Sequence, residues 1–498
     1  MEESSQDELK PGSVSDLNGL MSASGYPYQD KLCILLNLMS DDVICNGGQG
    51  YEKYVNTLKS GKPAFTWSSE LFQDMLVSGA NTKYLDSWIV IYNKISGCNV
   101  VLDYLDKVTG GNDARENLRG QALAMRAYYY FYLVNLFGKP YNSADPTKLP
   151  GVPLKLTMQV TDSLYPRSSV SDVYEQVIKD LKTAANILEM YPTENSVYKM
   201  NTNAIYTLLS RVYLYEENWD STIHYSSIVL SRKSELTNLN TFQGPGNGYY
   251  KYTGGTDNRI YNASVSPEIL WMYQKGYTSS TSLADVAGEG VFFPSSLDPF
   301  YTSTNPPPYC VSNELMALYD VKPQSDTLKY LGDLRGRIFI GYTSTVFYSP
   351  FFSLGYTQFF GGQGGLGIRL SEAYLNRAEA YIHRYLSGSS PNDCQAALND
   401  INKVRENRFD SRQPYEPINI QDGTTLLDFY KNERRREFPF EGHRWFDLRR
   451  YGMPEIKHTY TEDIGSTQEF VLGKGDNRYT LKIPKEVIDR NGALVQNP

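Results

Sequence analysis

The four histidines of this chain are the first candidates for catalysis, because a histidine beside a nucleophile or a metal carries much of hydrolytic chemistry. His224, His383, His443 and His458 lie far apart in the sequence, and there is no H-E-x-x-H or G-x-S-x-G pattern. The five cysteines form no C-x-x-C pair, so they predict neither a zinc site nor a redox motif. We therefore predict a protein that is not an enzyme and uses no cofactor or metal.

Two other patterns could carry chemistry. Residues Gly362–Gly367 satisfy G-x-G-x-x-G, which binds dinucleotides when it lies within a strand–helix–strand unit. Paired helices follow it here, so we interpret it as a loop. Neighbouring carboxylates such as Asp41 and Asp42, or Glu437 and Glu441, could serve a glycoside hydrolase. The pair Asp41 and Asp42 could equally accept hydrogen bonds from a hydroxylated ligand or cap a turn.

Aromatic side chains in irregular regions are the remaining candidates. The 498 residues include 41 Tyr, 20 Phe and 5 Trp. A tyrosine buries its ring and keeps its hydroxyl wet, which suits ligands with flat apolar faces and polar rims, as sugars have. An aromatic residue on a loop rich in Gly, Ser and Pro has fewer core neighbours than one on a helix, so it is a better stacking platform. The predicted binding residues are Trp67, Phe65, Asp42, Asn81, Tyr277, Phe292, Phe293, Tyr301 and Tyr309.

Helical periodicity dominates the segments that must position these residues. Apolar residues recur at steps of three and four, which is typical of amphipathic helices, and two pairs of segments have the length of tetratricopeptide units. Asp172 with Glu175 is expected to cap one helix. The expected helices are Tyr84–Val108, Arg115–Phe137, Ser171–Met190, a pair within Asn203–Ser231, Arg369–Tyr385 and Asn392–Arg408.

Residues 40–83 and 234–367 have a different composition, rich in Gly, Ser, Thr and aromatic residues. They predict loops, a few short strands and a helix near Asn313–Tyr319; Tyr479–Ile483 alternates like a further strand. Because long irregular insertions in helical scaffolds usually carry function, both regions are predicted to bind ligand. The predicted fold is one mainly α domain over residues 1–498, with a tetratricopeptide-like helix-pair scaffold at 84–233 and 368–452 and a large loop-rich insertion carrying a few short strands.

The charge balance argues against a nucleic-acid partner. Lys+Arg number 48 and Asp+Glu 56, giving a net charge of −8 and a pI near 5.3. The sequence contains no run of eighteen apolar residues, so it predicts no membrane-spanning helix. The acidic opening of the chain is typical of a polar tether in a mature protein, and a cytoplasmic protein would fit this end equally well. The sequence leaves it open whether Cys33 and Cys45 form a disulfide.

The densest cluster of arginines lies among acidic residues near the end of the chain, and alternating signs favour internal ion pairs. We expect the carboxylates of Glu437, Glu441 and Asp447 to receive bidentate hydrogen bonds, and two neighbouring aromatic residues to anchor the core. The donors would be Arg434, Arg435, Arg444 and Arg449, and the anchors Trp445 and Phe446.

This cluster carries a specific resemblance. The sequence K-N-E-R-R-R-E-F-P-F-E-G-H-R-W-F-D-L-R-R at 431–450 closely resembles the signature of SusD/RagB lipoproteins. Further segments resemble the family's motifs in the family's order; they are Arg119–Gly138, Leu370–Tyr381, Leu398–Arg405 and the closing Ile483-Pro484 with Asn491 and Gln496-Asn497-Pro498.

The resemblance implies a non-catalytic glycan-binding lipoprotein on the external face of a Bacteroidetes outer membrane. It would bind a polysaccharide or oligosaccharide for a SusC-like TonB-dependent transporter; the binding residues predicted above come from the composition of the loops and not from the resemblance. A lipid anchor on an N-terminal Cys, absent from this sequence, would be its only membrane attachment. Alternatives from the residues are a protein-interaction scaffold of helix pairs and a glycoside hydrolase. If Trp67 stacks on sugar, Trp67→Ala should weaken glycan retention without unfolding the protein.

Overall fold

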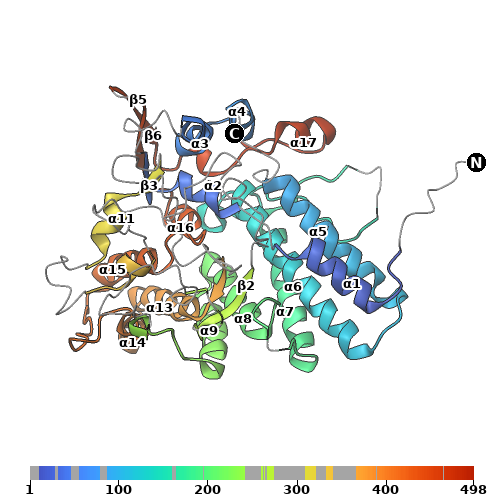
Figure 1. The fold of residues 1–498 in the computed structure, drawn as a ribbon, viewed down its shortest axis with the longest axis horizontal. Helices are drawn as coiled ribbons and strands as arrows, with labels where there is room; N and C mark the ends of the chain where they lie inside the picture. Colours follow the sequence, from blue (N-terminus) through green and yellow to red (C-terminus); the bar gives the residue numbers. More distant parts are fainter. Residues whose placement is uncertain are drawn as a thin grey trace, which may run out of the picture.

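The computed structural model describes residues 10–27, 32–45, 55–78, 87–159, 164–194, 196–241, 260–261, 263, 266–273, 309–320, 332–339, 366–388, 390–463 and 465–498. Within these ranges the chain is mainly helical (Figure 1). The helices are α1 (Val14–Leu20), continued by a π-helical turn at Met21–Gly25, α2 (Leu32–Met39), α3 (Val55–Phe65), α4 (Leu71–Val77), α5 (Ser87–Tyr104), α6 (Asn112–Phe137), α7 (Val170–Met190), α8 (Thr202–Tyr215), α9 (Trp219–Arg232), α11 (Asn313–Leu318), α12 (Arg335–Ile338), α13 (Leu370–Leu386), α14 (Pro391–Glu406), α15 (Gly423–Glu437), α16 (Arg444–Arg450) and α17 (Lys485–Arg490). The predicted mainly α fold is confirmed.

The long helices pack as successive neighbours. Helix α6 lies between α5 and α7, α8 pairs with α9, and α13 contacts both α9 and α14 (Figure 1). All the predicted helix positions are occupied by helices, with boundaries that differ by a few residues. The cap prediction on α7 is wrong in its partner: Ser169 is the N-cap and forms a capping box with Asp172, so Glu175 is not needed. No helix within the described ranges is both long and apolar enough to cross a membrane.

Many of the tyrosines belong to the core of this scaffold. Tyr129 and Tyr130 of α6 are 1% and 0% exposed. Their hydroxyls donate to the carbonyl oxygens of Gly25 (2.7 Å) and Lys155 (2.7 Å), which satisfies the polar end of each ring. Packing between helices therefore accounts for part of the high tyrosine content.

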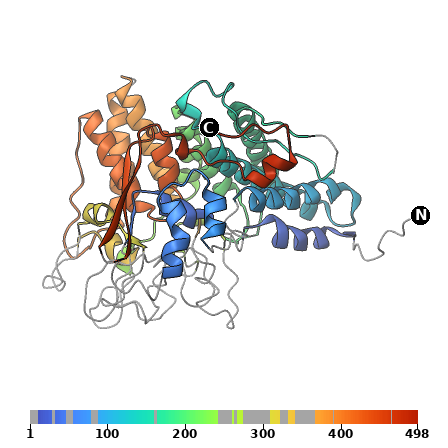
Figure 2. The same ribbon diagram turned by 90° about the horizontal axis from the view of Figure 1, so that it is seen from above.

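The strands form three short antiparallel pairs. They are β1 (Val43–Cys45) with β3 (Tyr309–Val311), β2 (Ile269–Tyr273) with β4 (Leu366–Arg369), and β5 (Ile456–Asp463) with β6 (Ser466–Leu472). The β5–β6 hairpin lies beside α3 (Figure 2). This hairpin was not predicted. The strand predicted at Tyr479–Ile483 is wrong, because Tyr479 ends a 3-10 turn and the residues after it pair with no strand in the described part of the chain. The segment 40–83, predicted as loops, contains α3 and α4.

A buried ion-pair cluster ties the later helices to the β2–β4 pair. The side chains of Arg369 and Arg408 are fully buried, and both contact Glu268 beside β2 and Glu437 of α15. Although burial opposes ionisation, Arg408 and Arg369 hold the pKa of Glu437 at about 2. The cluster consists of Arg335, Arg369, Arg408, Glu268, Glu433, Glu437 and Glu441.

The arginine partners predicted from the sequence are only partly right. Arg434 does pair with Asp447 (2.8 Å), and Trp445 and Phe446 are buried as predicted. Glu437 and Glu441, however, take their arginines from the ion-pair cluster. Arg449 contacts the carbonyl oxygen of Gly138 and the Thr480 hydroxyl (3.3 Å), so it caps backbone rather than a carboxylate. The arginines of one motif thus reach partners more than a hundred residues away, which spacing could not reveal.

Candidate functional site

The structure brings three of the predicted binding residues together, but inside the core. Trp67, Phe65 and Tyr309 are 1%, 0% and 2% exposed. The imidazole of His458 in β5 is sandwiched between the rings of Phe65 (4.1 Å, 14°) and Trp67 (4.2 Å, 23°). The indole N–H of Trp67 donates to the carbonyl oxygen of Met39 (2.8 Å). No ring face here is open to a sugar, so the stacking role predicted for these residues has no support from their placement.

The predicted binding residue Asp42 is likewise committed to the protein. It is 1% exposed and accepts a hydrogen bond from Arg435 (2.5 Å), while Asp41 accepts two from Arg444 (2.7 Å each). Burial raises the pKa of Asp42, whereas Arg444 and Arg435 outweigh burial at Asp41 and hold its pKa at about 2. These two carboxylates join the start of the chain to the arginine-rich motif. The other predicted residues, Asn81, Tyr277, Phe292, Phe293 and Tyr301, lie outside the described residues.

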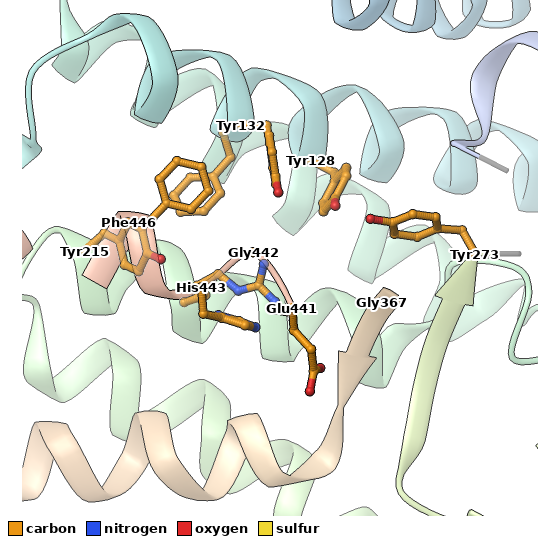
Figure 3. A pocket seen from close by; sticks show the side chains of 11 residues that line it. Tyr128, Tyr132, Tyr215, Tyr273, Gly367, Glu441, Gly442, His443 and Phe446 are labelled. Carbon is orange, nitrogen blue, oxygen red and sulfur yellow. The ribbon is translucent and has the colours of Figure 1, made fainter. Parts of the chain in front are cut away.

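A different group of aromatic residues surrounds a small pocket (Figure 3). The space between its atoms is about 360 Å³ when open solvent is counted, but the room inside is only about 10 Å³, enough for about one water molecule. We call it the tyrosine pocket. Its hydroxyl-bearing rings come from three elements, and Figure 3 shows these rings directing their oxygens toward the same space. The lining residues are Tyr128, Phe131, Tyr132, Arg211, Tyr215, Tyr273, Gly367, Glu441, Gly442, His443 and Phe446.

The wall on α6 follows from helical spacing. Tyr128, Phe131 and Tyr132 stand three and four positions apart, so they share one face of the helix. The ring of Tyr132 meets Phe446 of α16 edge-on (5.3 Å, 89°), and Tyr128 meets Trp271 of β2 edge-on (5.3 Å, 76°). Edge-to-face contacts of this kind fix the rings in place. The rings of the wall are therefore held rigidly before any ligand arrives.

The polar side of the pocket is built from arginines and the turn before α16. Arg211 of α8 makes a bidentate ion pair with Glu372 of α13 (2.5 and 2.6 Å). His443 Nδ1 lies 3.3 Å from a guanidinium nitrogen of Arg434. Burial, and then the charges of Arg211 and Arg434, lower the pKa of His443 well below its usual range. Because a guanidinium can only donate, Nδ1 of this neutral ring must accept, which leaves Nε2 as a donor.

Two further oxygens contribute acceptor and donor capacity. Glu441 accepts from Arg369 (2.6 and 3.2 Å) and from the hydroxyl of Tyr261 (2.6 Å), and burial raises its pKa. The hydroxyl of Tyr215 is buried and has no hydrogen-bond partner among the described residues. A buried hydroxyl without a partner costs about 1–3 kcal/mol, which a ligand or a water in the pocket would recover.

The pocket holds donors, acceptors and aromatic edges, and it contains no arrangement of a nucleophile beside a base. Among the residues that the structure describes, no three His, Cys, Asp or Glu side chains come close enough to hold a metal ion. What the geometry can do is bind a small, uncharged, hydroxyl-bearing group. Its charged members, Arg211 and Glu441, are both already paired.

Sequence comparison then decides the family. A model described as the SusD family matches residues 160–498, more than half of the chain. The chain belongs to the SusD family. A second model, described as SusD-like and as starch-binding and associating with the outer membrane, matches residues 42–214. The resemblance seen in the arginine-rich motif is thereby confirmed.

Relatives of this SusD-family chain are similar in sequence, and the solved structures among them are similar in fold. The SusD-like protein P38 of Formosa agariphila is 22% identical over 430 residues, covering 80% of this chain and 77% of that protein. A crystal structure of a SusD-like carbohydrate binding protein from Bacteroides vulgatus is 18% identical, covers 97% of this chain and 98% of its own, and has a TM-score of 0.64. A SusD superfamily protein from Bacteroides fragilis is 21% identical, with coverages of 97% and 99% and a TM-score of 0.66.

The residues of the tyrosine pocket escaped the sequence reasoning for a clear reason. Tyr128 and Tyr132 lie within Arg115–Phe137, which its apolar periodicity predicts to be a packing helix, and helical periodicity cannot tell a core face from a pocket wall. A usable signal did exist. The motif that carries Glu441 and His443 is the most specific of the SusD family in this chain, and the turn within it lies against α6.

Proposed function

We propose that this protein captures a polysaccharide or oligosaccharide at the external face of the outer membrane and passes it to a SusC-like TonB-dependent transporter. Membership of the SusD family supports the capture of glycan. The family descriptions name starch binding and the outer membrane, and a structural relative is described as carbohydrate binding. Transfer to a transporter and attachment by a lipid anchor belong to the proposal.

The observation that carries the proposal is the convergence of tyrosine hydroxyls in the tyrosine pocket. A sugar residue presents hydroxyls on its rim and C–H groups on its faces, so it matches a wall of ring edges with polar groups opposite. The hydroxyl of Tyr215 and the Nε2 donor of His443 supply directional contacts. The pocket has room for about one water molecule, so we propose that a single hydroxyl group of the glycan enters it while the sugar ring stays at its mouth.

We propose a non-catalytic role for the same pocket. Hydrolysis of a glycosidic bond needs two carboxyl groups flanking the bond, one of them ionised and open to the substrate. The one carboxyl group lining the tyrosine pocket is that of Glu441, which is 3% exposed on its side chain and held by Arg369. Binding without turnover is the behaviour that this arrangement supports.

The test is native affinity electrophoresis in gels containing starch or one of a panel of other polysaccharides. The wild type should be retarded by at least one of them. Tyr215→Phe removes only the unpartnered hydroxyl and should weaken the binding by about fivefold, the equivalent of one hydrogen bond. Tyr430→Phe is the matched control, because its hydroxyl is also buried without a partner among the described residues and does not line the pocket.

Each outcome separates the functions. Retardation that Tyr215→Phe reduces and Tyr430→Phe leaves intact supports glycan capture at the hydroxyl of Tyr215. Retardation equal in all three proteins supports capture at another site. No retardation by any polysaccharide, combined with co-purification of an outer-membrane transporter, would favour the protein-interaction scaffold instead.

A further inference from the structure

A second pocket shares Tyr215 with the tyrosine pocket. Its other lining residues come mainly from the end of α8, the start of α9, α13, α15 and the end of α16. It has about 140 Å³ of room inside, and about 450 Å³ when all the space between its atoms and open solvent is counted. We call it the Trp219 pocket, after the first residue of α9. Tyr215 lines both pockets, but the remaining walls are entirely different.

Trp219 is the partly exposed tryptophan of this chain. The other four, Trp67, Trp88, Trp271 and Trp445, are at most 5% exposed. The indole of Trp219 stacks on the imidazole of His383 in α13, with ring centroids 4.2 Å apart and planes 2° apart. Burial, opposed by Glu379, lowers the pKa of His383, so the imidazole is neutral at neutral pH. The stack fixes the plane of the indole, and a fixed indole at a pocket is a preformed platform.

The charges at the Trp219 pocket are already paired. The guanidinium of Arg450 makes two hydrogen bonds to Glu379 and one to Asp447 (2.9 Å). Glu217 at the rim accepts a hydrogen bond from the amide of Asn142 (2.7 Å). The pocket therefore has no concentration of one sign that would select an ion or a phosphate.

Two polar groups at the rim remain suited to a neutral ligand. The ammonium group of Lys431 lies 5.0 Å from the ring centroid of Tyr451, a third of its side chain is exposed, and its nearest carboxylate oxygen, on Asp428, is 3.9 Å away. Lys431 can donate, and the second carboxylate oxygen of Glu217 can accept. An aromatic plane flanked by one donor and one acceptor is the pattern that a sugar residue satisfies, with its C–H face on the ring and its hydroxyls at the rim.

We propose that the Trp219 pocket is a second carbohydrate site that binds a neutral sugar residue against the indole of Trp219, with Lys431 and Glu217 holding its hydroxyls. The inference rests on the proposed glycan-capture function and adds a contact point separate from the tyrosine pocket. Two sites on one protein would let a long polysaccharide bind more tightly than a short oligosaccharide.

The experiment uses tryptophan fluorescence, because the chain itself isolates the signal. Acrylamide should quench Trp219 and leave the four buried tryptophans nearly untouched, and Trp219→Phe identifies that fraction. Oligosaccharides prepared from the polysaccharide that retards the wild type best are then the probe. They should protect the Trp219 fraction from quenching, and Lys431→Ala should weaken the protecting affinity by about fivefold.

Lys107→Ala is the matched control, because Lys107 also lies over a tyrosine ring (5.1 Å from the centroid of Tyr104) and is remote from the pocket. Protection that Lys431→Ala weakens and Lys107→Ala does not would support the second site. Retardation in the gel without protection of Trp219 would overturn it and leave glycan capture standing. The absence of retardation by every polysaccharide would overturn glycan capture and the second site with it.

Discussion

Trp67 and Trp219 each stack on a histidine, and the two stacks differ in nearly everything else. Trp67 is 1% exposed, and its indole N–H donates to the carbonyl oxygen of Met39. The ring of His458 lies between the rings of Trp67 and Phe65. Trp219 is partly exposed, stacks on His383 and lines a pocket together with polar side chains. The same pair of residue types therefore serves the core in one region and offers a surface in the other.

The difference teaches that local sequence context is a weak guide to exposure in this fold. Trp67 follows α3 in a stretch rich in Ser and Gly, which predicts a loop and an exposed ring. The β5–β6 hairpin, about 390 residues further along the chain, covers it. Trp219 lies in the predicted helix pair within Asn203–Ser231, at the turn between its two helices, and it occupies the first position of α9.

The largest effect is expected from a substitution that breaks the buried stack of Trp67 on His458. Trp67→Ala removes a fully buried indole and its hydrogen bond, and it should lower the free energy of unfolding by about 3–5 kcal/mol. Urea unfolding followed by circular dichroism measures this, with Trp67→Phe as the control that keeps a ring against His458. A stable Trp67→Ala protein with weakened glycan retention would instead restore the binding role first predicted for Trp67.

The sequence predicted the scaffold well and the partners poorly. Helices such as α6 and α7 carry their own apolar stripes and caps, so local periodicity is sufficient to find them. The carboxylate of Asp42 has its guanidinium partner at Arg435, and Arg369 has Glu268 and Glu437. Such pairs are set by how distant segments pack, and no spacing within one segment encodes them. The pocket tyrosines were hidden for the same reason.

The second largest effect is expected from the ion pair between Glu379 and Arg450, next to the stack of Trp219 on His383. Glu379 lies beneath His383 and holds Arg450; although burial opposes ionisation, Arg450 keeps the pKa of Glu379 at about 2. Glu379→Gln leaves part of a buried guanidinium unpaired and should cost about 3 kcal/mol at neutral pH. Because the folded-state pKa lies below the unfolded value, this stabilisation is complete above about pH 4.5 and disappears as the pH falls toward 2.

Denaturant unfolding of Glu379→Gln at pH 7 and at pH 3 measures both parts of this prediction. Glu406→Gln is the control, since Glu406 pairs with Lys403 at 3.7 Å on the surface and should contribute less than about 0.5 kcal/mol. Equal losses from the two substitutions would show that the ion pair beneath Trp219 is no more important than a surface pair.

The third effect is a pH dependence of stability that comes from His458, the histidine stacked on Trp67. Burial lowers the pKa of His458 to about 4, against the opposing contacts of its nitrogens with the carbonyl oxygens of Phe65 (2.6 Å) and Ser40 (3.0 Å). Between pH 6.5 and 4 the unfolded chain binds a proton that the folded chain does not, so stability falls as the pH falls. The loss between pH 7 and pH 5 from this group is about 2 kcal/mol.

An NMR titration of the imidazole signals, assigned with His458→Gln, tests the prediction directly. His458 should titrate near pH 4, and His458→Gln should flatten the pH dependence of unfolding over the same range. A pKa of 6.5 or above would mean that the ring is charged and donates to both carbonyl oxygens. The clamp between Phe65 and Trp67 would then hold an imidazolium, and acid would strengthen it.

The smallest effect is expected from removing the partly exposed indole of Trp219. Trp219→Ala removes a partly exposed ring and one stack, and it should lower the free energy of unfolding by only about 1–2 kcal/mol, well below the loss expected for Trp67→Ala. Its melting curve, measured beside that of Trp67→Ala, tests whether exposure rather than residue type sets the cost. If the two substitutions cost the same, Trp219 is a core residue, and its stack on His383 serves packing as that of Trp67 does. If Trp219→Ala is mild while retardation by the polysaccharide in the affinity gel is weakened, the ring is retained for what it binds.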